Sequence, residues 1–282
     1  MHELLLFGQV PSVRHDQLLK ILAGIAGMQP QRVVERHLIF KPSPSPIQRG
    51  GQVGGSQGVQ GAQIQALQGQ MHGDLFFLQL VGDIAGSSET VDSAADPRDV
   101  MMSDDDKDGS TGGKLLSNGT SQSDKTRAAL QTPQQTWSLQ FRDLPEAGRR
   151  PVTSRLMADI AIISGNTLLF MEALGYQYTT EYILSGSQFI HGNLILLLHH
   201  HLRVPTSASS VSPRGHVPAI SALQPLDPSG TYLLQASIRV KDGNKPESMS
   251  IGINELKAFK DLMKGVVEME VGDRLALDTR AR

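Results

Sequence analysis

The stretch YQYTTEYILSGSQFIHGNLILLLHHHLRV, residues 176–204, decides the fold. Two segments of strand composition, 176–184 and 193–204, lie on either side of His191-Gly192-Asn193. A short turn with glycine at its centre is typical of the connection between two antiparallel strands. This stretch therefore predicts a β-hairpin, and the same strand pattern recurs along the chain.

Short segments rich in β-branched or aromatic residues, bounded by Gly, Pro or Asn, occur along most of the chain. Besides the hairpin they predict strands over 2–10, 36–42, 74–82, 136–144, 152–163, 231–240 and 266–271, and another in RLALDTR near the C-terminus. Many antiparallel strands with few helices indicate an α+β fold built on a closed or nearly closed, many-stranded β-barrel.

Helical periodicity is confined to three segments. DQLLKILAGIAG places Leu18, Leu19, Leu22, Ile25 and Ala26 on one face, with Asp16 as its expected cap and Gly27 at its end. IGINELKAFKDLMKG does the same with Ile253, Leu256, Phe259, Leu262 and Met263, and it ends at Gly265. A third, short helix is expected over 166–175. Two or three helices would thus cover the barrel.

Three stretches lack a period of 2 or 3.6 and are expected to be low-complexity, disordered insertions within a single domain of residues 1–282. Residues 43–73 include a segment, 48–73, with 8 Gly and 8 Gln among 26 residues. Residues 83–135 are rich in Ser, Asp, Gly and Thr, and residues 205–229 hold five Pro and six Ser, which indicates a long exposed connection.

The bulk composition excludes several classes of function. The net charge of -2 supplies no basic field for a phosphate backbone, so nucleic acid is not the expected direct partner. The absence of cysteine excludes disulfides, thiolate zinc sites and a cysteine nucleophile. The longest apolar run, 194–198, is far shorter than a membrane span, so we expect a soluble intracellular protein.

Each candidate metal site in the sequence lacks a required ligand. Asp104, Asp106 and Asp108 fit the first ligands of a calcium loop, but Leu115 stands where a bidentate Glu is required. His199 and His201 would project on one face of a strand, as a two-histidine metal site needs, but a third ligand is missing. A strand that emerges into solvent is the preferred interpretation of His199–His201.

The C-terminal segment carries the serious enzymatic candidate. On a strand Glu268 and Glu270 share a face and could hold Mg²⁺ or Mn²⁺ inside a barrel. Arg274, Asp278 and Arg280 have the same parity, whereas Leu275 and Leu277 alternate with them. The charges are therefore either a catalytic row or the polar side of a closing strand whose residues pair with one another.

Aromatic residues gather around the predicted hairpin, at Tyr176, Tyr178, Tyr182 and Phe189. Aromatic side chains often anchor interfaces, but at a period of two they are also ordinary strand core, which is the preferred interpretation here. The candidate structural or partner-interface residues are Tyr176, Tyr178, Glu181, Tyr182, Phe189, Arg274, Asp278 and Arg280. No catalytic, cofactor-binding or metal-binding residue is assigned.

Three blocks resemble the Mediator complex subunit 18 family in its filamentous-fungal form. They are HELLLFGQVPSVRHDQLLKILAGIAGMQP with RVVERHLIFKP, then RRPVTSRLMADIAIISGNTLLFMEALGYQYTTEYILSGSQFIHGNLILLLHHHL, and finally SGTYLLQASIRVKDGNKPESMSIGINELKAFKDLMKGVVEMEVGDRLALDTRAR. The blocks keep the family's order, and the gaps between them fall at the predicted insertions. LGYQYTTEYILSGSQF and GDRLALDTR are the most specific parts of the match.

The resemblance implies a barrel subunit of the Mediator head module, a nuclear coactivator that connects transcription regulators to RNA polymerase II. It implies pairing with Mediator subunit 20, which has a related barrel, a tether through the C-terminal helix of subunit 8, and contact with other head subunits. The family's barrel is similar to triphosphate-tunnel RNA triphosphatases, which keeps a metal-dependent tunnel phosphohydrolase as the alternative. Fold similarity does not transfer chemistry, and ExExK is absent, so a non-catalytic scaffold without cofactors is expected.

Overall fold

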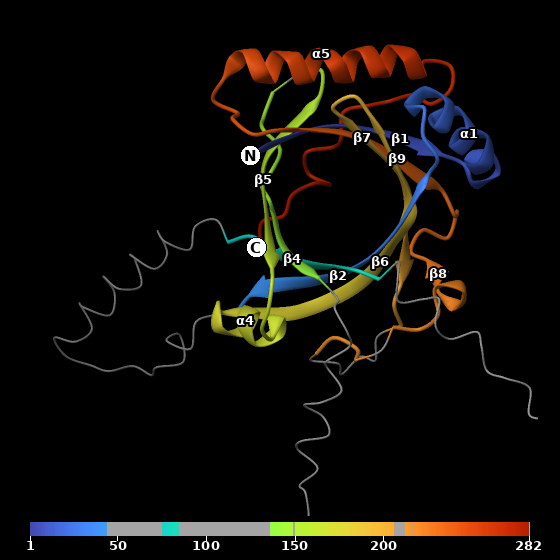
Figure 1. Cartoon of the computed structure of the whole chain (residues 1–282). Coiled ribbons are helices and arrows are strands. Elements are labelled where there is room, and N and C mark those ends of the chain that lie inside the picture. The colour runs from blue at the N-terminus through green and yellow to red at the C-terminus, as the bar shows by residue number, and fades with distance from the viewer. Residues whose placement is uncertain (44–74, 85–135, 149, 206–211, 216, 282) are drawn as a thin grey trace, which may run out of the picture.

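The computed structural model describes residues 1–43, 75–84, 136–148, 150–205, 212–215 and 217–281. Seen along its axis, the described part is a β-barrel with helices on the outside of its wall (Figure 1). All strand pairings are antiparallel, in the order β6-β2-β3-β4-β5-β1-β9-β7-β8, and an additional β6–β7 pairing closes eight of these strands into a ring. The predicted fold class, an antiparallel β-barrel with covering helices, is confirmed.

The strands follow the predicted segments closely. They are β1 (His2–Val10), β2 (Gln31–Pro42), β3 (Leu78–Asp83), β4 (Trp137–Arg142), β5 (Thr153–Ile162), β6 (Tyr176–His191), β7 (Leu194–Arg203), the two-residue β8 (Gln224–Pro225) and β9 (Tyr232–Val240). The main difference is length, since β2 begins five residues before the expected 36 and β6 continues seven residues beyond the expected 184.

The hairpin that closes the ring joins β6 to β7. His191 pairs with Leu194 across a two-residue turn in which Gly192 has a φ of 60°, as the sequence predicts. The extension of β6 passes through Gly186, which lies opposite His199. A Cβ atom there would stand 2.3 Å from the carbonyl oxygen of Leu198, so glycine allows the two strands to stay paired.

Three helices and two short 3-10 turns complete the described elements. The helices are α1 (His15–Ala26), α4 (Thr167–Ala173) and α5 (Pro246–Met263), and the turns are η1 (Ser12–Arg14) and η4 (Ile220–Ala222). Gly27 ends α1 in the left-handed conformation, as predicted, but Asp16 does not cap it, because Arg14 occupies the cap position. Asn166 caps α4 by accepting from the backbone N–H groups of Leu168 and Leu169.

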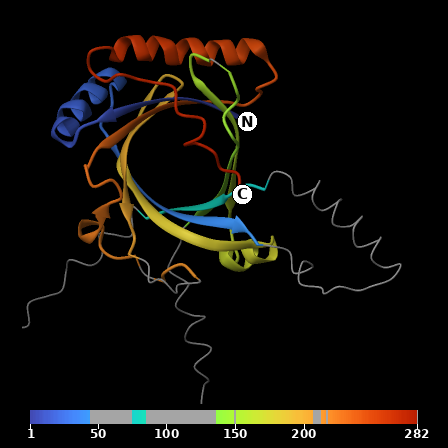
Figure 2. The ribbon, with the colours of Figure 1, turned by 180° about the vertical axis from the view of Figure 1, so that it is seen from behind.

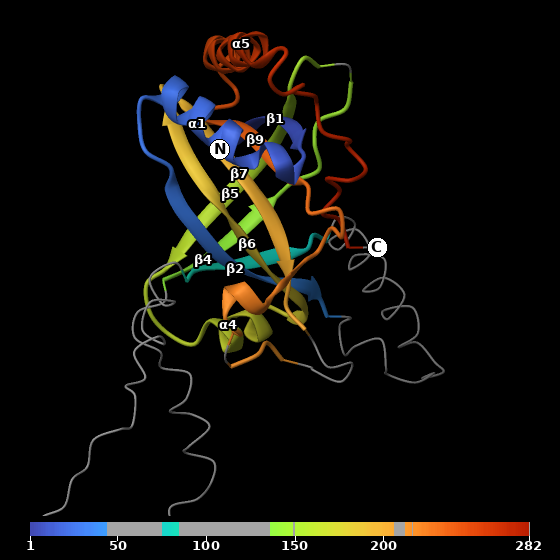
Figure 3. The same ribbon diagram turned by 90° about the vertical axis from the view of Figure 1, so that its right-hand side faces the viewer.

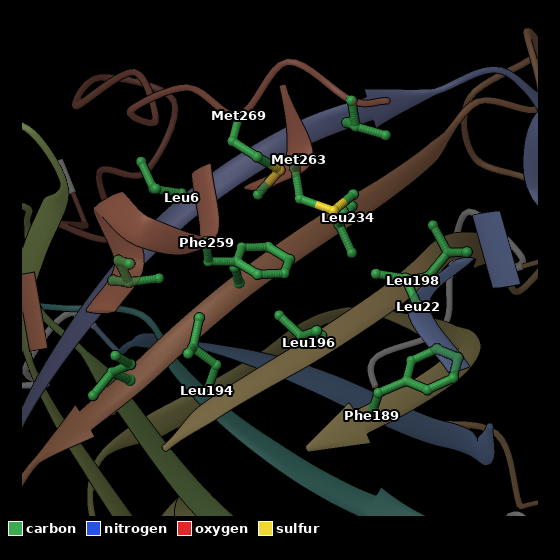
Figure 4. Packing of buried hydrophobic residues seen from close by; sticks show 14 of the residues in the cluster. Leu6, Leu22, Phe189, Leu194, Leu196, Leu198, Leu234, Phe259, Met263 and Met269 are labelled. Atoms are coloured by element: carbon green, nitrogen blue, oxygen red, sulfur yellow. The ribbon is translucent and has the colours of Figure 1, made fainter. Parts of the chain in front are cut away.

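The largest core lies outside the barrel wall, between the strands and helices α1 and α5 (Figures 1 and 4). Leu4 and Leu6 of β1 point from the wall toward this core, and Leu256 and Phe259 reach it from α5. Helix α5 comes close to β1 at the buried Gly252, where a Cβ atom would stand 2.8 Å from Leu4 Cδ1. The outward face of the wall is therefore the apolar face.

Two smaller clusters also lie on the outer surface. One contains Val34, Ile183, Leu202, Val204 and Leu223, against which Ile84, Val217 and Ile220 pack. The other joins Met171 of α4 to Leu38, Phe40 and Leu80. Part of the segment expected to be a long exposed connection, 205–229, is thus packed onto the barrel, whereas nearly all of 43–73 and 83–135 falls outside the described residues.

The C-terminal tail does not form the two strands that its alternation predicts. Residues 266–271 make a single bridge to β1, Phe7 with Glu270, and the last residues make one bridge, Phe76 with Arg280. Residues 274–277 form a turn, and Leu275 is 69% exposed instead of packing onto the wall. The tail crosses one end of the barrel (Figures 2 and 3). None of the described helices is long and apolar enough to cross a membrane.

Candidate functional site

The outer side of β4 and β5 presents apolar side chains that the described helices leave uncovered. Leu4 points outward into the core under α5 and pairs with Ser154, so alternate residues of β5 from Ser154 onward also point outward. These include Leu156 and Ile160, which are 40% and 58% exposed. Ile160 pairs with Leu139 of β4, so the neighbouring strand presents an apolar residue on the same side.

This apolar surface continues onto α4. Ile162 of β5 and Leu139 of β4 pack against the cluster that contains Met171 of α4, so the helix lies beside the two strands. Large apolar side chains remain exposed at both places. We call this set the bare face: Leu156 and Ile160 on the outer side of β5, Ile163 just after its end, and Leu169, Phe170 and Leu174 on and just after α4. In Figure 1 the β5 side of the ring has no helix over it, in contrast to the side beneath α5.

The inner side of the same strands is charged. Glu3 accepts from Arg155 through Nε at 3.0 Å and Nη2 at 2.9 Å, and Arg142 Nη1 donates to Asp159 at 2.5 Å. Arg239 Nη1 lies 3.6 Å from the second oxygen of Asp159. Because Arg142 Nε also lies 3.8 Å from the Glu3 carboxylate, the two carboxylates and three guanidinium groups form one network inside the barrel. On β4 and β5 most of the inward residues are polar or charged and most of the outward residues are apolar, although the buried Met157 has the inward parity.

Rings from β2, β6 and β7 stack inside the barrel. His37 stacks on Tyr182 with 4.7 Å between centroids, Tyr182 meets His201 edge-on at 5.0 Å, and His201 meets His199 edge-on at 5.1 Å. Burial and the neighbouring His201 lower the pKa of His199 to about 4, and burial and His37 lower the pKa of His201 to about 4. The interpretation of these histidines as a strand end in solvent is wrong for His199, which is 3% exposed.

Glu181 lies in a buried ion pair on the outer side of the wall. Its carboxylate accepts from Arg36 Nε at 2.8 Å and from Arg36 Nη2, and its other oxygen accepts from the backbone N–H of Arg214 at 3.2 Å. Arg36 Nη2 also donates to the carbonyl oxygen of Arg214 at 2.7 Å. The pair therefore holds the chain around Arg214 against β2 and β6.

The predicted aromatic residues lie in different places. Tyr176 and Tyr178 pack on the cluster under α4, Tyr182 stands in the ring stack, and Phe189 is fully buried beneath α1. Burial and the Glu181 carboxylate raise the pKa of Tyr178 to about 12. These positions are those of core side chains, and a role of any of them in a partner interface stays a prediction.

The charged residues of the tail have local partners. Asp278 accepts from Arg280 through both oxygens, with Nε and Nη2 each at 2.9 Å. Arg274 Nε donates to the carbonyl oxygen of Pro145 at 2.7 Å. These contacts fix the tail on itself and on the loop after β4, which is a structural arrangement rather than a row of groups that faces a substrate.

The two tail glutamates do share a face, but they do not point into a metal-binding tunnel. Glu268 and Glu270 are exposed, while Val267 and Met269 alternate with them and are buried against Gly8. Within the described residues, no group of three or more His, Asp or Glu side chains could hold a metal ion. The geometry there offers two carboxylates at the edge of a pocket and no converging third group.

The bare face and the charged interior were missed by the sequence reasoning, although a signal for them exists. In β5 the charged residues Arg155 and Asp159 have one parity, and Leu156 and Ile160 have the other. This pattern indicates that one face of the strand is charged and the other is apolar. The pattern alone does not say which face points into the barrel.

Comparison with known proteins places the chain in a family. A family model described as Med18 protein matches residues 2–280. Over the full length of both chains, the protein is 42% identical to the Mediator of RNA polymerase II transcription subunit 18 of Aspergillus clavatus and 36% identical to that of Coccidioides immitis. A chain in the Schizosaccharomyces pombe Mediator head module shares the fold, with a TM-score of 0.61 at 17% identity over 96% of this chain and 99% of that one. The protein therefore belongs to the Med18 family.

Proposed function

We propose that this protein is a non-catalytic subunit of the Mediator coactivator, located in the head module, and that it acts by holding other proteins in place. The observation that carries the proposal is the bare face, because six large apolar side chains on or beside the neighbouring elements β5 and α4 are exposed, and exposed apolar surface often marks a protein–protein interface. The names of its full-length relatives identify the complex. The resulting role is to help couple regulators to transcription by RNA polymerase II in the nucleus.

The partners in this proposal are Mediator subunit 20, through a related barrel, and the C-terminal helix of Mediator subunit 8. The exposed apolar side chains on β5 and α4 lie on the outside of the wall, as do those that α5 covers elsewhere. An amphipathic helix from another chain would cover them in the same way, through residues spaced i, i+3, i+4 and i+7. RNA polymerase II is contacted through the assembled complex.

Co-expression with subunit 20 and the C-terminal segment of subunit 8, followed by gel filtration, tests the proposal. The wild-type chain is expected to elute as a complex, and L156D/I160D is expected to elute alone with an unchanged circular dichroism spectrum. The matched control is I251D/L262D on α5, whose side chains are 58% and 55% exposed but lie off the bare face. Absence of a wild-type complex contradicts the assignment of partners, whereas equal loss in both variants contradicts the assignment of the surface.

A phosphate-release assay tests the proposal that the protein is not catalytic. Incubation of the purified protein with Mn²⁺ and a nucleoside triphosphate is expected to release no phosphate above the buffer rate. The glutamates at 268 and 270 lie on the surface without a third acidic or histidine ligand among the described residues. Rapid release that Glu268→Ala abolishes would show that the scaffold role is incomplete.

A further inference from the structure

A row of side chains crosses the inner face of the wall near one end of the barrel. Gln9 of β1 pairs with Leu233 of β9, and Leu233 also pairs with His199 of β7. Directly paired residues project on the same side of a sheet, and His199 points into the barrel, so all three face its interior. The bridge between β1 and the tail continues this register and brings Glu268 toward Gln9. The row therefore runs from the tail across β1 and β9 to β7.

Two pockets, of about 580 and 410 Å³, lie over this row. Gln9 and Leu233 line both pockets, so together they form one groove, which we call the mouth groove. It lies at the end of the barrel that the tail crosses (Figure 3). Neighbouring strands are about 4.8 Å apart, so the three spacings from the tail to β7 make the groove roughly 14 Å long.

The mouth groove is acidic at both ends. Glu268 and Glu270 line one end, and they are exposed and form no ion pair with a described residue. Asp227 lines the other end, where the Ser229 hydroxyl and backbone N–H donate to it at 2.6 and 2.9 Å, lower the pKa of its carboxyl and keep it ionised. Among the described residues that line the groove, only Arg14 carries a positive charge at pH 7. The groove is therefore net negative.

Two histidines on the floor of the groove offer ring nitrogens to a ligand. His199 is 3% exposed, and its one hydrogen bond to a described residue is a long one, in which Nδ1 donates to the carbonyl oxygen of Leu197 at 3.4 Å. A ring that donates through Nδ1 has Nε2 as an acceptor. The ring of His201 forms no hydrogen bond within the described part of the chain. Both pKa values are about 4, so at pH 7 both rings are neutral acceptors that do not repel a cation.

The length and the charges of the groove define its occupant. An extended segment advances about 3.3 Å per residue, so its residues i and i+4 lie roughly 13 Å apart and project on the same side. Basic side chains at these two positions would reach Glu268 and Glu270 at one end and Asp227 at the other. The side chain at i+2 would lie over Leu233, which favours an apolar residue there.

We propose that the mouth groove binds an extended segment of a partner protein that carries Lys or Arg at positions i and i+4 and an apolar residue at i+2. The segment lies across the strands, on side chains of the inner face, and does not pair with a strand edge. Its N–H groups donate to the rings of His199 and His201. Because the groove shares no residue with the bare face, binding here is independent of the partners proposed for that face.

Fluorescence anisotropy with the labelled peptide Lys-Ser-Val-Ser-Lys measures binding to the full chain. The wild type is expected to bind it with a Kd below about 1 mM. E268Q/E270Q is expected to bind it about tenfold more weakly, because the lysine at that end loses both carboxylates. The matched control is E172Q/E247Q, which removes the same charge from exposed positions on α4 and α5 and is expected to bind as the wild type does.

A shuffled peptide, Lys-Lys-Ser-Val-Ser, tests the spacing at equal charge and composition. It is expected to bind about fivefold more weakly, because its adjacent lysines project on opposite sides and do not reach both ends of the groove. Circular dichroism establishes that each protein variant is folded before its binding is measured.

Three results would contradict the proposal. Equal weakening in E172Q/E247Q and E268Q/E270Q would mean that the peptide responds to the overall charge of the protein and not to the groove. Equal binding of the two peptides would mean that the i, i+4 spacing is not recognised. Absence of wild-type binding up to about 1 mM would exclude the site.

Discussion

The side chain of Glu181 is fully buried, so its charge depends on Arg36 and on the backbone N–H of Arg214. Replacement of Glu181 by Leu would leave the guanidinium of Arg36 buried without a counter-charge. We expect the free energy of unfolding to fall by about 3–5 kcal/mol, because the buried guanidinium would have neither water nor a carboxylate to stabilise its charge in the folded state. Urea denaturation followed by circular dichroism measures this loss.

The double variant R36M/E181L is the control for this prediction. It removes both charges and replaces them with apolar side chains, so most of the lost stability should return. If the double variant is as unstable as Glu181→Leu, the pair matters through its contacts with the chain at Arg214 and not through compensation of charge.

His199 and His201 make the stability of the protein depend on pH. Their pKa values are lowered from 6.5 to about 4 in the folded chain, so between these values the unfolded chain binds more protons. Stability is therefore full above pH 6.5, falls as the pH drops toward 4, and levels off below. From pH 7 to pH 5 we expect a loss of about 2 kcal/mol per histidine. Thermal unfolding at a series of pH values measures it.

The variant H199L/H201L separates these two groups from other titrating side chains. It should lose much of the dependence of Tm on pH between 7 and 5, whereas His191→Gln, at the end of β6 and outside the ring stack, should keep it. An unchanged dependence in H199L/H201L would mean that other groups cause the pH effect.

Helix α5 contributes stability through one narrow face. The sequence places Phe259 and Leu262 on the same apolar stripe, but Phe259 is 2% exposed and Leu262 is 55% exposed. We expect Phe259→Ala to cost about 3–5 kcal/mol of unfolding free energy, and Leu262→Ala to change it by less than about 0.5 kcal/mol. Urea denaturation of both variants checks this. Similar losses would mean that the exposed edge of the helix is also covered.

The elements that alternation predicted well are those with a partner strand on each side. β1 was predicted at 2–10 and is found at His2–Val10, between β5 and β9. The segment 266–271 alternates equally well, with Val267 and Met269 buried, but it finds only Phe7 as a partner. Alternation of polar and apolar residues predicts that an extended segment has two unlike faces. A β-strand also needs a neighbouring strand to pair with, and the sequence does not show which strand edges are free for pairing.

The candidate site was less predictable than the fold. The aromatic residues of the hairpin region were named as core or interface, and Phe189 at 0% exposure shows how completely one of them is buried. The His199–His201 run was expected at a strand end in solvent, but His199 and His201 point into the barrel, whose interior accepts polar side chains. Burial of Glu181 depends on Arg214, more than thirty residues away, which no local pattern reveals.

At the scale of the whole molecule, the barrel has its apolar core outside its wall. Stability therefore depends on what covers each part of the ring. β1, β7 and β9 lie beneath α1 and α5, with Leu196, Leu234 and Ala236 fully buried, whereas Leu156 and Ile160 of β5 stay exposed. The covered and the exposed parts of the wall belong to one sheet, and the partner surface that we propose is the part without helices.

This arrangement predicts an uneven pattern of hydrogen exchange around the ring. Amides of β9 should exchange most slowly, because β9 pairs with β1 and β7 and packs under α5, and amides of β4 and β5 should exchange at least tenfold faster. Mass spectrometry of exchanged peptides from the free protein measures the difference.

The same measurement on the complex with Mediator subunits tests the partner surface. If exchange slows only in β4, β5 and α4, the partner binds the bare face. Equal protection of β4 and β9 in the free protein would instead show that the whole barrel opens as a single unit, and that the covering helices do not divide its stability.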